Sequence, residues 1–561
     1  MNRLWLENYP PGIPAEIDPD RYRSVPDLLE KSVVKFAGKP AFHNLGHSLT
    51  YAELDRLSRD FAAFLQGLPG LVKGERVAIM APNLLQYPVA LFGILRAGMV
   101  VVNVNPLYTP RELEHQLKDS GAKAIVIVEN FAGILQQVIG STPVRHVITT
   151  QVGDMLPRPK RWIVNLVLKK VKKMVPAWRI DGAIRFRKAL ARGAAAALEP
   201  VDVTREDIAF LQYTGGTTGV SKGAMLTHRN ILANMEQTGA WISTSFREGA
   251  DIAIAPLPLY HIFCLTATLS FMKWGALNVL VTNPRDLPAL VKELGRWKWT
   301  IMTGVNTLFN GLLNTPGFDK LDFSSLKAVI GGGAAVQEAV AKRWQQVTGH
   351  YLTEGYGLTE ASPVVCANPI GRPWNGSIGI PYPSTELSIR DEAFNELPPW
   401  TGAGDIEKHT GEICVRGPQV MKGYWNNAAE TAKVMQDGWL KTGDIGHMDA
   451  TGQFTITDRK KDMILVSGFN VYPSEIEGVV MTLPGVLECG VVGIPDAKTG
   501  EAVKVVIVRK DPTLAKEAVL AHCKAHLTGY KLPRHVEFRD ALPKTPIGKV
   551  LRRELRDAPK V

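Results

Sequence analysis

The most informative stretch of this chain is Tyr213-Thr214-Gly215-Gly216-Thr217-Thr218-Gly219-Val220-Ser221-Lys222-Gly223. It places four glycines, three threonines, a serine and a lysine within eleven residues. It follows the apolar run 208–211, which predicts a buried strand. The stretch is therefore expected to be a glycine-rich loop at the end of a strand.

Such a loop is suited to binding phosphate. Glycine lets the backbone come close to an anion, and successive N–H groups can form a concave nest for phosphate oxygens. The hydroxyls add donors or a metal contact, and Lys222 adds a positive charge. The spacing G-x-x-x-x-G-K-[ST] is absent, so this is not a Walker A loop. We predict a nucleotide-phosphate loop of another geometry; the alternative is a plain Gly/Thr turn.

Length and composition limit the class of protein. A chain of 561 residues exceeds one hydrophobic core, so at least two domains are expected. The five cysteines are scattered without a C-x-x-C pair, which favours reduced thiols in the cytosol and argues against a zinc site. The chain starts without the apolar region of a signal peptide. Its longest apolar stretch, 87–104, is interrupted by Arg96 and Gly98 and predicts a buried helix and a strand, not a membrane span.

The net charge of +11 is partly concentrated in one segment. Residues 158–188 contain eleven Lys or Arg and one acid, interleaved with apolar residues that include Trp162 and Trp178. A basic amphipathic segment of this kind can lie on an anionic membrane surface. The alternatives are a solvated helix and a nucleic-acid patch. Because no nucleic-acid fold signature accompanies the segment, we expect no nucleic-acid partner.

The order of predicted elements divides the chain. Helical and strand patterns alternate over the first 450 residues, as in α/β proteins. Thr50 and Glu53 form a capping box before a helix, and strands are expected at 76–80, 100–104, 124–128, 251–255, 278–281 and 326–330. Short strands at 387–389, 411–416 and 454–457 predict a small antiparallel sheet or barrel. After Arg459, a helix that begins with a capping box near Ser474 and strands at 488–492 and 503–508 predict a small α+β domain.

Six further segments carry polar or glycine-rich chemistry. They are 258–263 with one histidine in an apolar run, 331–335, 355–360, 439–444, 464–470 and 543–549. Taken singly, each has an ordinary structural explanation, such as a buried histidine, a tight turn or a helix cap. Tyr356, Thr359 and Glu360 could nevertheless stack a base, bind phosphate and hold Mg²⁺.

Together these segments resemble the adenylate-forming enzymes, which include acyl-CoA synthetases, luciferases and nonribosomal-peptide adenylation domains. The motifs occur in the family's order and cover nearly the whole chain. Residues 437–461 resemble the signature of fatty acyl-CoA synthetases, and the chain is similar throughout to the bacterial long-chain fatty-acid–CoA ligases of fatty-acid degradation. The resemblance implies an α/β fold with a large N-terminal domain, 1–458, made of two α/β subdomains and a small β-barrel. A small mobile α+β domain, 459–561, would carry the catalytic lysine.

The resemblance also implies a reaction and a set of site residues. A fatty acid would attack the α-phosphate of MgATP, and the thiol of coenzyme A would then displace AMP. The matching residues are Lys549, His261 and Thr359 for catalysis; Thr217 and Glu360 for Mg²⁺; and Tyr213, Thr214, Gly215, Gly216, Thr217, Thr218, Gly219, Lys222, Gly332, Gly355, Tyr356, Gly357, Asp444, Arg459, Lys461, Gly468 and Phe469 for ATP and coenzyme A. Among these, Lys549 would bridge the carboxylate and the α-phosphate, and Lys461 would be the hinge.

The expected acid is long and uncharged. Gly357 stands where acetate-activating relatives carry a tryptophan that closes the pocket, and residues 256–272 contain no Asp or Glu to bind a substrate amine. Leu265 replaces a tryptophan that gates the tunnel in some long-chain enzymes, which leaves the chain-length limit open. The alternatives are a medium-chain or aryl-acid ligase, an acyl-AMP ligase, and an inactive membrane adaptor. We expect a cytoplasmic enzyme on the inner face of the membrane; the sequence leaves oligomerisation open.

Overall fold

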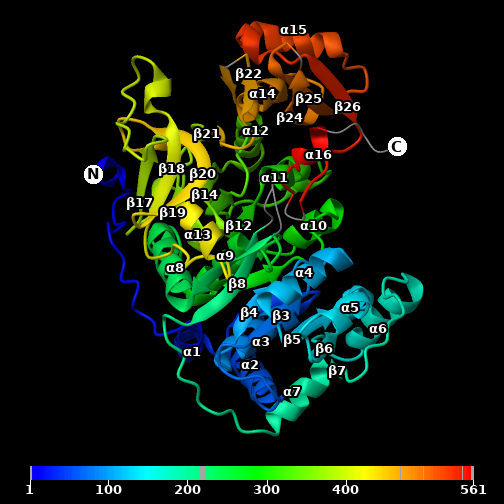
Figure 1. Ribbon diagram of the computed structural model, residues 1–561. Helices are drawn as coiled ribbons and strands as arrows, with labels where there is room; N and C mark the ends of the chain where they lie inside the picture. Colours follow the sequence, from blue (N-terminus) through cyan, green and yellow to red (C-terminus); the bar gives the residue numbers. More distant parts are fainter. Residues whose placement is uncertain (1–2, 215–220, 468, 497, 546–547, 557–561) are drawn as a thin grey trace.

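The computed structural model describes residues 3–214, 221–467, 469–496, 498–545 and 548–556. Figure 1 shows two large α/β layers in its lower half, a smaller sheet at the upper left and a separate small domain at the top. The α/β class expected from the sequence is confirmed. Among the described residues, none of the helices combines the length and apolar character needed to cross a bilayer.

Seven strands form one large sheet, in the order β7-β6-β5-β3-β4-β8-β9. Their bounds are β3 (Arg76–Met80), β4 (Val100–Asn103), β5 (Ala124–Val128), β6 (His146–Thr150), β7 (Ile184–Arg185), β8 (Ile208–Thr214) and β9 (Lys222–Thr227). Every neighbouring pair is parallel except β8 and β9. All five residues of β5 are buried, as a continuous apolar run in a parallel sheet covered on both faces requires.

Nine strands form the second large sheet, in the order β16-β15-β14-β13-β12-β10-β11-β1-β2. They are β1 (Pro40–Asn44), β2 (His47–Thr50), β10 (Ile252–Ala255), β11 (Leu277–Leu280), β12 (Ile301–Gly304), β13 (Ala328–Gly331), β14 (Leu352–Gly357), β15 (Val364–Ala367) and β16 (Ile380–Pro381). Its centre is parallel, from β1 through β11, β10, β12 and β13 to β14.

Helices join the two sheets into one hydrophobic core. The helices of this large domain are α1 (Val25–Phe36), α2 (Tyr51–Gln66), α3 (Gln86–Arg96), α4 (Pro110–Ser120), α5 (Ala132–Val138), α6 (Lys160–Leu166), α7 (Phe186–Ala194), α8 (His228–Ile242), α9 (Ile262–Lys273), α10 (Leu287–Leu294), α11 (Asn306–Leu313), α12 (Glu338–Thr348) and α13 (Ala428–Val434). Every residue of α3 is buried, and apolar residues of α3, α8 and α9 belong to the same cluster as those of β3 and β15. The capping box predicted at Thr50 is present: its hydroxyl accepts from the Glu53 N–H at 3.1 Å.

A smaller antiparallel sheet stands beside the two large ones. Its strands are β17 (Glu386–Arg390), β18 (Gly411–Arg416), β19 (Met435–Gln436), β20 (Trp439–Met448) and β21 (Phe454–Arg459). The expected closed barrel is wrong in one respect: the sheet is open, since in the described residues no pairing joins β17 to β21. With five strands, the sheet instead packs one face on the main core through Leu387, Ile413 and Phe454.

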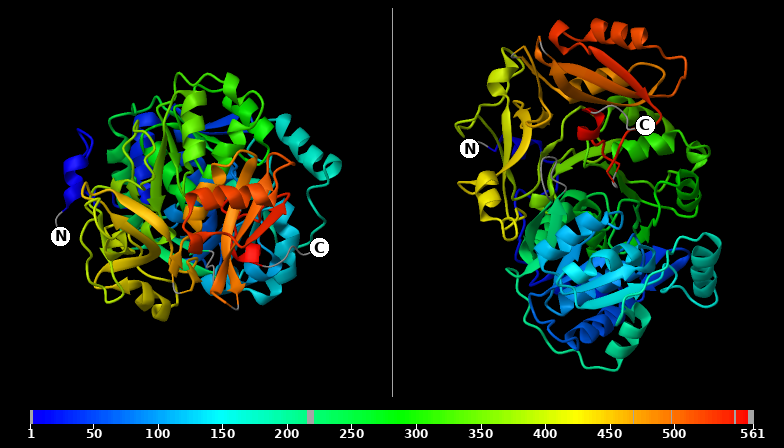
Figure 2. Two further views of the ribbon diagram at one scale, coloured as in Figure 1. Left: turned by 90° about the horizontal axis from the view of Figure 1, so that it is seen from above. Right: turned by 45° about the vertical axis from the view of Figure 1, so that its right-hand side comes forward.

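The beginning of the chain covers this sheet. The short 3-10 helix Leu4–Asn8 places Trp5, which is 1% exposed, against Phe454 with ring centroids 6.3 Å apart. Arg3 forms an ion pair with Glu386 at 2.6 Å. Figure 2 shows the N-terminus beside this sheet in both views. These first described residues therefore cover a sheet whose strands begin almost 400 residues later.

The small domain at the top of Figure 1 has its own sheet and core. It contains β22 (Ile464–Val466), β23 (Phe469–Val471), β24 (Val486–Asp496), β25 (Gly500–Arg509) and β26 (His535–Arg539), with α14 (Pro473–Met481), α15 (Lys516–His526) and α16 (Arg553–Arg556). The capping box predicted at Ser474 is wrong, because α14 begins at Pro473 and Ser474 already lies in its first turn. The helix takes its cap from elsewhere, as described below.

Candidate active site

Three strands end at one region of the molecule. β8 ends at Thr214, β13 at Gly331 and β14 at Gly357. The Gln212 side chain of β8 donates to the Tyr260 carbonyl at 2.8 Å. This bond ties the loop before His261 to the seven-stranded sheet. Open α/β sheets bind ligands beyond the carboxyl ends of their strands. The segments singled out from the sequence therefore face one common region.

The glycine-rich loop connects β8 and β9. Thr214 and Lys222 lie opposite each other in the antiparallel register of these strands, so the two ends of the loop are adjacent. Gly215, Gly216, Thr217, Thr218 and Gly219 lie outside the described residues. The predicted contacts of these five residues with phosphate, and of Thr217 with Mg²⁺, remain predictions.

Lys222 belongs to a small polar cluster. Its ammonium group forms an ion pair with Glu430 of α13 and lies 5.2 Å from the ring centroid of Tyr424. The Tyr424 hydroxyl donates to Glu360 Oε1 at 2.7 Å. Tyr424 thus links the lysine predicted for phosphate with the carboxylate predicted for Mg²⁺.

Glu360 is suited to hold a divalent cation. Its carboxylate is only partly buried and is oriented by Tyr424, and carboxylate oxygens are preferred ligands of Mg²⁺. Within the described part of the chain, no three His, Cys, Asp or Glu side chains gather closely enough to hold a metal by themselves. This donor set fits an ion that arrives bound to nucleotide phosphates rather than one caged by protein.

Tyr213 has a supporting position. Its hydroxyl donates to Asp119 Oδ2 at 2.5 Å. Its ring lies against Gly223, where an added Cβ would stand 3.0 Å from the ring. The phenol is therefore engaged by Asp119, and the contact of Tyr213 with a nucleotide remains a prediction.

Asp444 is the centre of a buried polar trio. The Tyr356 hydroxyl donates to its Oδ2 at 2.5 Å, and Arg459 Nε lies 3.0 Å from its Oδ1. Asp444 is 2% exposed, so its charge depends on these two partners. Burial raises the pKa of Tyr356, with a further contribution from Asp444, which keeps the phenol protonated as a donor. The structure thus brings three of the predicted nucleotide-binding residues into direct contact.

Gly332 allows two loops to approach each other. An added Cβ would stand 3.1 Å from the Gly355 carbonyl oxygen and 3.3 Å from the Phe263 ring. Gly355 lies on β14, not in the turn that the sequence suggested. Glycine at 332 therefore permits a close approach of two backbone segments and an aromatic ring. The contact of Gly332 with adenine remains a prediction.

Lys549 reaches this region from the small domain. The Gly548 carbonyl accepts from the Thr307 hydroxyl of α11 at 3.2 Å, which docks the lysine loop on the large domain. Burial lowers the pKa of Lys549 to about 8, with a further lowering by the charge of Arg459. Burial also lowers the pKa of His261 to about 4, assisted by the charge of Lys549. His261 is therefore a neutral neighbour of a cationic lysine.

The remaining predicted residues occupy different places. Thr359 begins the short 3-10 helix Thr359–Ala361 directly after β14, beside Glu360. Lys461 is exposed in the turn after β21. Phe469 is 54% exposed and stacks on Tyr530 of the small domain, with ring centroids 4.6 Å apart. Gly468 lies outside the described residues.

Several contacts at the site were missed from the sequence. They involve Asp119, Tyr424 and Glu430, whose partners are 64 to 208 residues away along the chain. The only local signal was the aromatic pair Tyr424-Trp425 after a glycine, which by itself predicts no ligand. Such partners become visible only when the strands and α13 are placed in space.

Comparisons with known proteins agree with this geometry. The model of the AMP-binding enzyme family matches residues 29–425, and that of the AMP-binding enzyme C-terminal domain matches 475–549. The chain belongs to the AMP-binding enzyme family. Among its relatives, a long-chain-fatty-acid–CoA ligase of Escherichia coli O6:H1 is 56% identical over 99% of this chain and 98% of its own. One from Bacillus subtilis (strain 168) is 40% identical over 98% and 97%.

A solved structure of this family has the same overall fold. The anthranilate CoA ligase AuaEII in complex with anthranoyl-AMP superimposes with a TM-score of 0.84 at 26% identity, covering 96% of this chain and 98% of its own. The AMP-binding match ends at Trp425, and the C-terminal match includes Lys549. The trio joins Tyr356 in the first matched region to Asp444 and Arg459, which lie between the two matched regions.

The geometry of Gly357 corrects one interpretation. A Cβ at this position would lie 2.2 Å from the Pro363 carbonyl oxygen and 2.7 Å from its carbonyl carbon. The adjacent backbone therefore requires glycine here, and the missing side chain does not by itself open a tunnel for an acyl chain.

Substitution of the two glycines of β14 tests whether Gly357 is required by packing against the backbone. Gly357→Ala should lower stability by about 1–3 kcal/mol or more, because the Cβ would push directly on backbone. Gly355→Ala on the same strand is the matched control, since its Cβ would meet only ordinary contacts at 3.5 Å or longer. Thermal unfolding of both variants measures the difference. Equal midpoints would contradict the packing explanation.

Proposed function

We propose that this chain joins long-chain fatty acids to coenzyme A in an ATP-dependent reaction that passes through an acyl-adenylate. The observation that carries the proposal is the position of Lys549, docked from the small domain next to the Asp444–Arg459 pair. A cationic lysine at a buried nucleotide site can stabilise charge that develops between a carboxylate and a phosphate. The E. coli relative, with 56% identity over nearly the full length, supports the choice of acid and acceptor.

The proposed reaction has two balanced steps. In the first, a carboxylate oxygen of the fatty acid bonds to the α-phosphorus of ATP, the bond to the β-phosphate oxygen breaks, and pyrophosphate leaves. In the second, the sulfur of coenzyme A bonds to the acyl carbon, the bond to AMP breaks, and the thiol proton passes to solvent. Lys549 acts in the first step by neutralising charge at the α-phosphate.

We assign the nucleotide contacts from the resemblance to the adenylate-forming enzymes, and the contacts of Tyr356, Asp444 and Arg459 described above support the assignment. Asp444 and Arg459 bind the ribose, and Tyr356 and Gly332 flank the adenine. Thr359 meets the α-phosphate. The loop between Thr214 and Lys222 receives the β- and γ-phosphates, and Glu360 with Thr217 binds the Mg²⁺ that accompanies ATP.

The second step requires a different face of the small domain. Phe469 is exposed in this conformation and Lys461 lies in the turn just before the small domain's sheet. We assign Lys461 as the hinge between domains 1–458 and 459–561. Rotation there withdraws Lys549 and presents Phe469 and Gly468 for thioester formation, so one site serves two reactions in turn.

The acid-binding region is apolar. Leu265 on α9 is 2% exposed, and residues 256–272 contain no Asp or Glu. Each buried methylene contributes roughly 0.8 kcal/mol, so an apolar site can favour long chains over short ones. His261 lines this region as a neutral side chain.

A panel of acids tests the proposed function. Purified enzyme should release AMP with palmitate or oleate only when coenzyme A is present, and should do so much more slowly with hexanoate and benzoate. The expected ratio is large because a tail of ten additional methylenes contributes several kcal/mol of burial. AMP release that is independent of coenzyme A would indicate an acyl-AMP ligase, and a preference for benzoate would indicate an aryl-acid ligase.

The pH dependence of the first step reports on Lys549. Its lowered pKa of about 8 means that the ammonium charge is present below pH 8 and is lost as the pH rises through that value. We therefore expect kcat/KM for pyrophosphate release to fall above about pH 8, well below the value near 10.4 of an ordinary lysine. Arginine keeps its charge beyond pH 12. The residual activity of Lys549→Arg should therefore not decline above pH 8. An unchanged alkaline limb in the variant would contradict the assignment.

We further propose that the segment around α6 rests on an anionic membrane, where fatty acids are found. Five large apolar side chains there are between 52% and 72% exposed: Trp162, Ile163, Leu166, Val171 and Met174. A helix packed on its own domain would bury such residues. They lie next to the exposed lysines Lys169, Lys170, Lys172 and Lys173, the arrangement of an interfacial segment. Figure 1 shows α6 at the edge of the molecule.

Liposome cosedimentation tests this contact. Replacing Lys169, Lys170, Lys172 and Lys173 with Gln should weaken binding to anionic vesicles, since each basic residue contributes about 1 kcal/mol near such a surface. Salt should also release the parent protein, because the Debye length falls from about 10 Å at 0.1 M to about 3 Å at 1 M. A matched control replaces the exposed lysines Lys298, Lys320, Lys510 and Lys516 with Gln. Equal loss in both quadruple variants would argue for general charge attraction only.

A further inference from the structure

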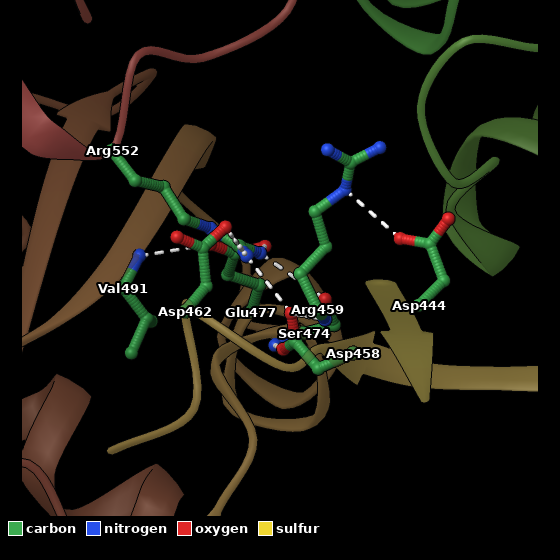
Figure 3. A network of polar contacts seen from close by, with 8 residues as sticks. All are labelled: Asp444, Asp458, Arg459, Asp462, Ser474, Glu477, Val491 and Arg552. Carbon is green, nitrogen blue, oxygen red and sulfur yellow. Dashed lines mark hydrogen bonds and ion pairs between the residues drawn. The ribbon is translucent and has the colours of Figure 1, made fainter. Parts of the chain in front are cut away.

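Arg552 is the centre of a polar network at the junction of the two domains (Figure 3). Its guanidinium meets Glu477 of α14 in a two-pronged arrangement, Nη2 to Oε2 at 2.8 Å and Nε to Oε1 at 3.2 Å. Nη1 also reaches Asp458 Oδ1 at 3.0 Å and Asp462 Oδ2 at 3.3 Å. One arginine near the C-terminus thus contacts three carboxylates from two parts of the chain.

Asp458 contributes a second contact across the same junction. It lies on β21, and its side chain is 1% exposed. Its Oδ2 accepts from the Ser474 N–H at 2.8 Å, in the first turn of α14. The residue before α14, Tyr472, makes no side-chain cap within the described residues. A carboxylate of the large domain therefore caps a helix of the small domain, where the helix dipole favours negative charge.

The network is directly connected to the lysine of the site. Arg552 follows Lys549 by three residues. The intervening segment is held at Lys544–Val550 by a β-bridge and at Leu551 by a hydrogen bond to the Pro543 carbonyl. Fixing Arg552 against Asp458 therefore limits where Lys549 can lie relative to β21, whose last residue, Arg459, pairs with Asp444.

We propose that Asp458 and Arg552 are positioning residues that hold the small domain in the orientation that delivers Lys549. The proposal rests on the two-step function proposed above, in which the small domain rotates at Lys461. Asp458 precedes that hinge, whereas Asp462, Glu477 and Arg552 follow it. Rotation separates Asp458 from Arg552 and from the start of α14, but leaves the contact between Arg552 and Glu477 intact.

This difference predicts a selective effect. Loss of the Asp458 carboxylate weakens only the orientation used for the first step, and the partly buried Arg552 loses one of its counter-charges there. Loss of the Glu477 carboxylate disturbs a contact inside the small domain that both orientations use. The two carboxylates touch the same arginine, so substitution of each by its amide is a matched pair.

The experiment measures both half-reactions on the full-length enzyme. Acyl-adenylate formation is followed as pyrophosphate release from ATP and palmitate without coenzyme A, and thioester formation is followed from supplied palmitoyl-adenylate and coenzyme A. Asp458→Asn should slow the first at least tenfold and leave the second unchanged or faster. Glu477→Gln should alter both by similar factors. Amide hydrogen exchange at Ser474 should rise in Asp458→Asn, because its acceptor is weakened.

Two outcomes would overturn the proposal: equal loss of both half-reactions in Asp458→Asn, or an unchanged first half-reaction in that variant. If Asp458→Asn does not fold, Arg552→Lys provides the same comparison, since lysine keeps the charge but cannot contact Asp458 and Glu477 with the same fork. It should slow the first half-reaction more than the second. If the parent enzyme itself lacks either half-reaction, the proposed function is wrong. Failure of the proposed function is therefore distinguishable from failure of the positioning role.

Discussion

The site depends on one buried carboxylate that must keep its charge. Asp444 is held by the Tyr356 hydroxyl at 2.5 Å and by Arg459 at 3.0 Å. Tyr356 comes from the nine-stranded sheet, and Asp444 and Arg459 come from the small open sheet. An unpaired charge in this position would cost several kcal/mol. The pairing therefore fixes the relative position of two sheets and places Arg459 at the point where the chain leaves for the small domain.

Electrostatics around Arg459 also set the character of Lys549. Burial, and after it nearby positive charges, lower the pKa of Lys549, whereas the charge of Asp444 opposes that lowering. A free lysine ammonium is strongly hydrated, so bringing it into a buried site requires compensation by acidic groups or by an incoming anion. The charge of Asp444 provides only part of that compensation. In the proposed function the phosphates of ATP supply the remainder, so binding of the nucleotide and docking of the lysine loop favour each other.

Much of the fold could be predicted from the sequence because local patterns were consistent. The apolar runs that became β3, β5 and β18 and the capping box at Thr50 depend only on nearby residues. Two errors have a common cause. The first turn of α14 is capped by Asp458 across the domain junction, and the small sheet stays open because it packs on the main core. Neither the cap of α14 nor the open edge of the small sheet can be predicted from a short stretch of sequence.

The candidate site divides in the same way. Asp444, Arg459, Tyr356 and Glu360 could be named because they lie in motifs, and the structure gathers the first three into direct contact. The supporting position of Tyr213 and the packing demand at Gly357 could not be foreseen, since each depends on a distant partner: Asp119 in the first case, Pro363 and its backbone in the second. Thr217 and Gly468 lie outside the described residues, and their roles remain predictions.

The contact of Trp5 with Phe454 has a consequence for how the chain acquires its structure. These side chains are separated by about 450 residues, and β1 pairs with β11 across more than 200. Contacts of high sequence separation slow folding, because the chain must lose much conformational entropy before they form. During synthesis Trp5 cannot reach Phe454 until the small open sheet has emerged from the ribosome. Tyr9 finds a partner sooner, since its ring packs edge-on against Trp241 with centroids 5.7 Å apart. The contact between Trp5 and Phe454 therefore forms only after nearly the whole large domain has been made.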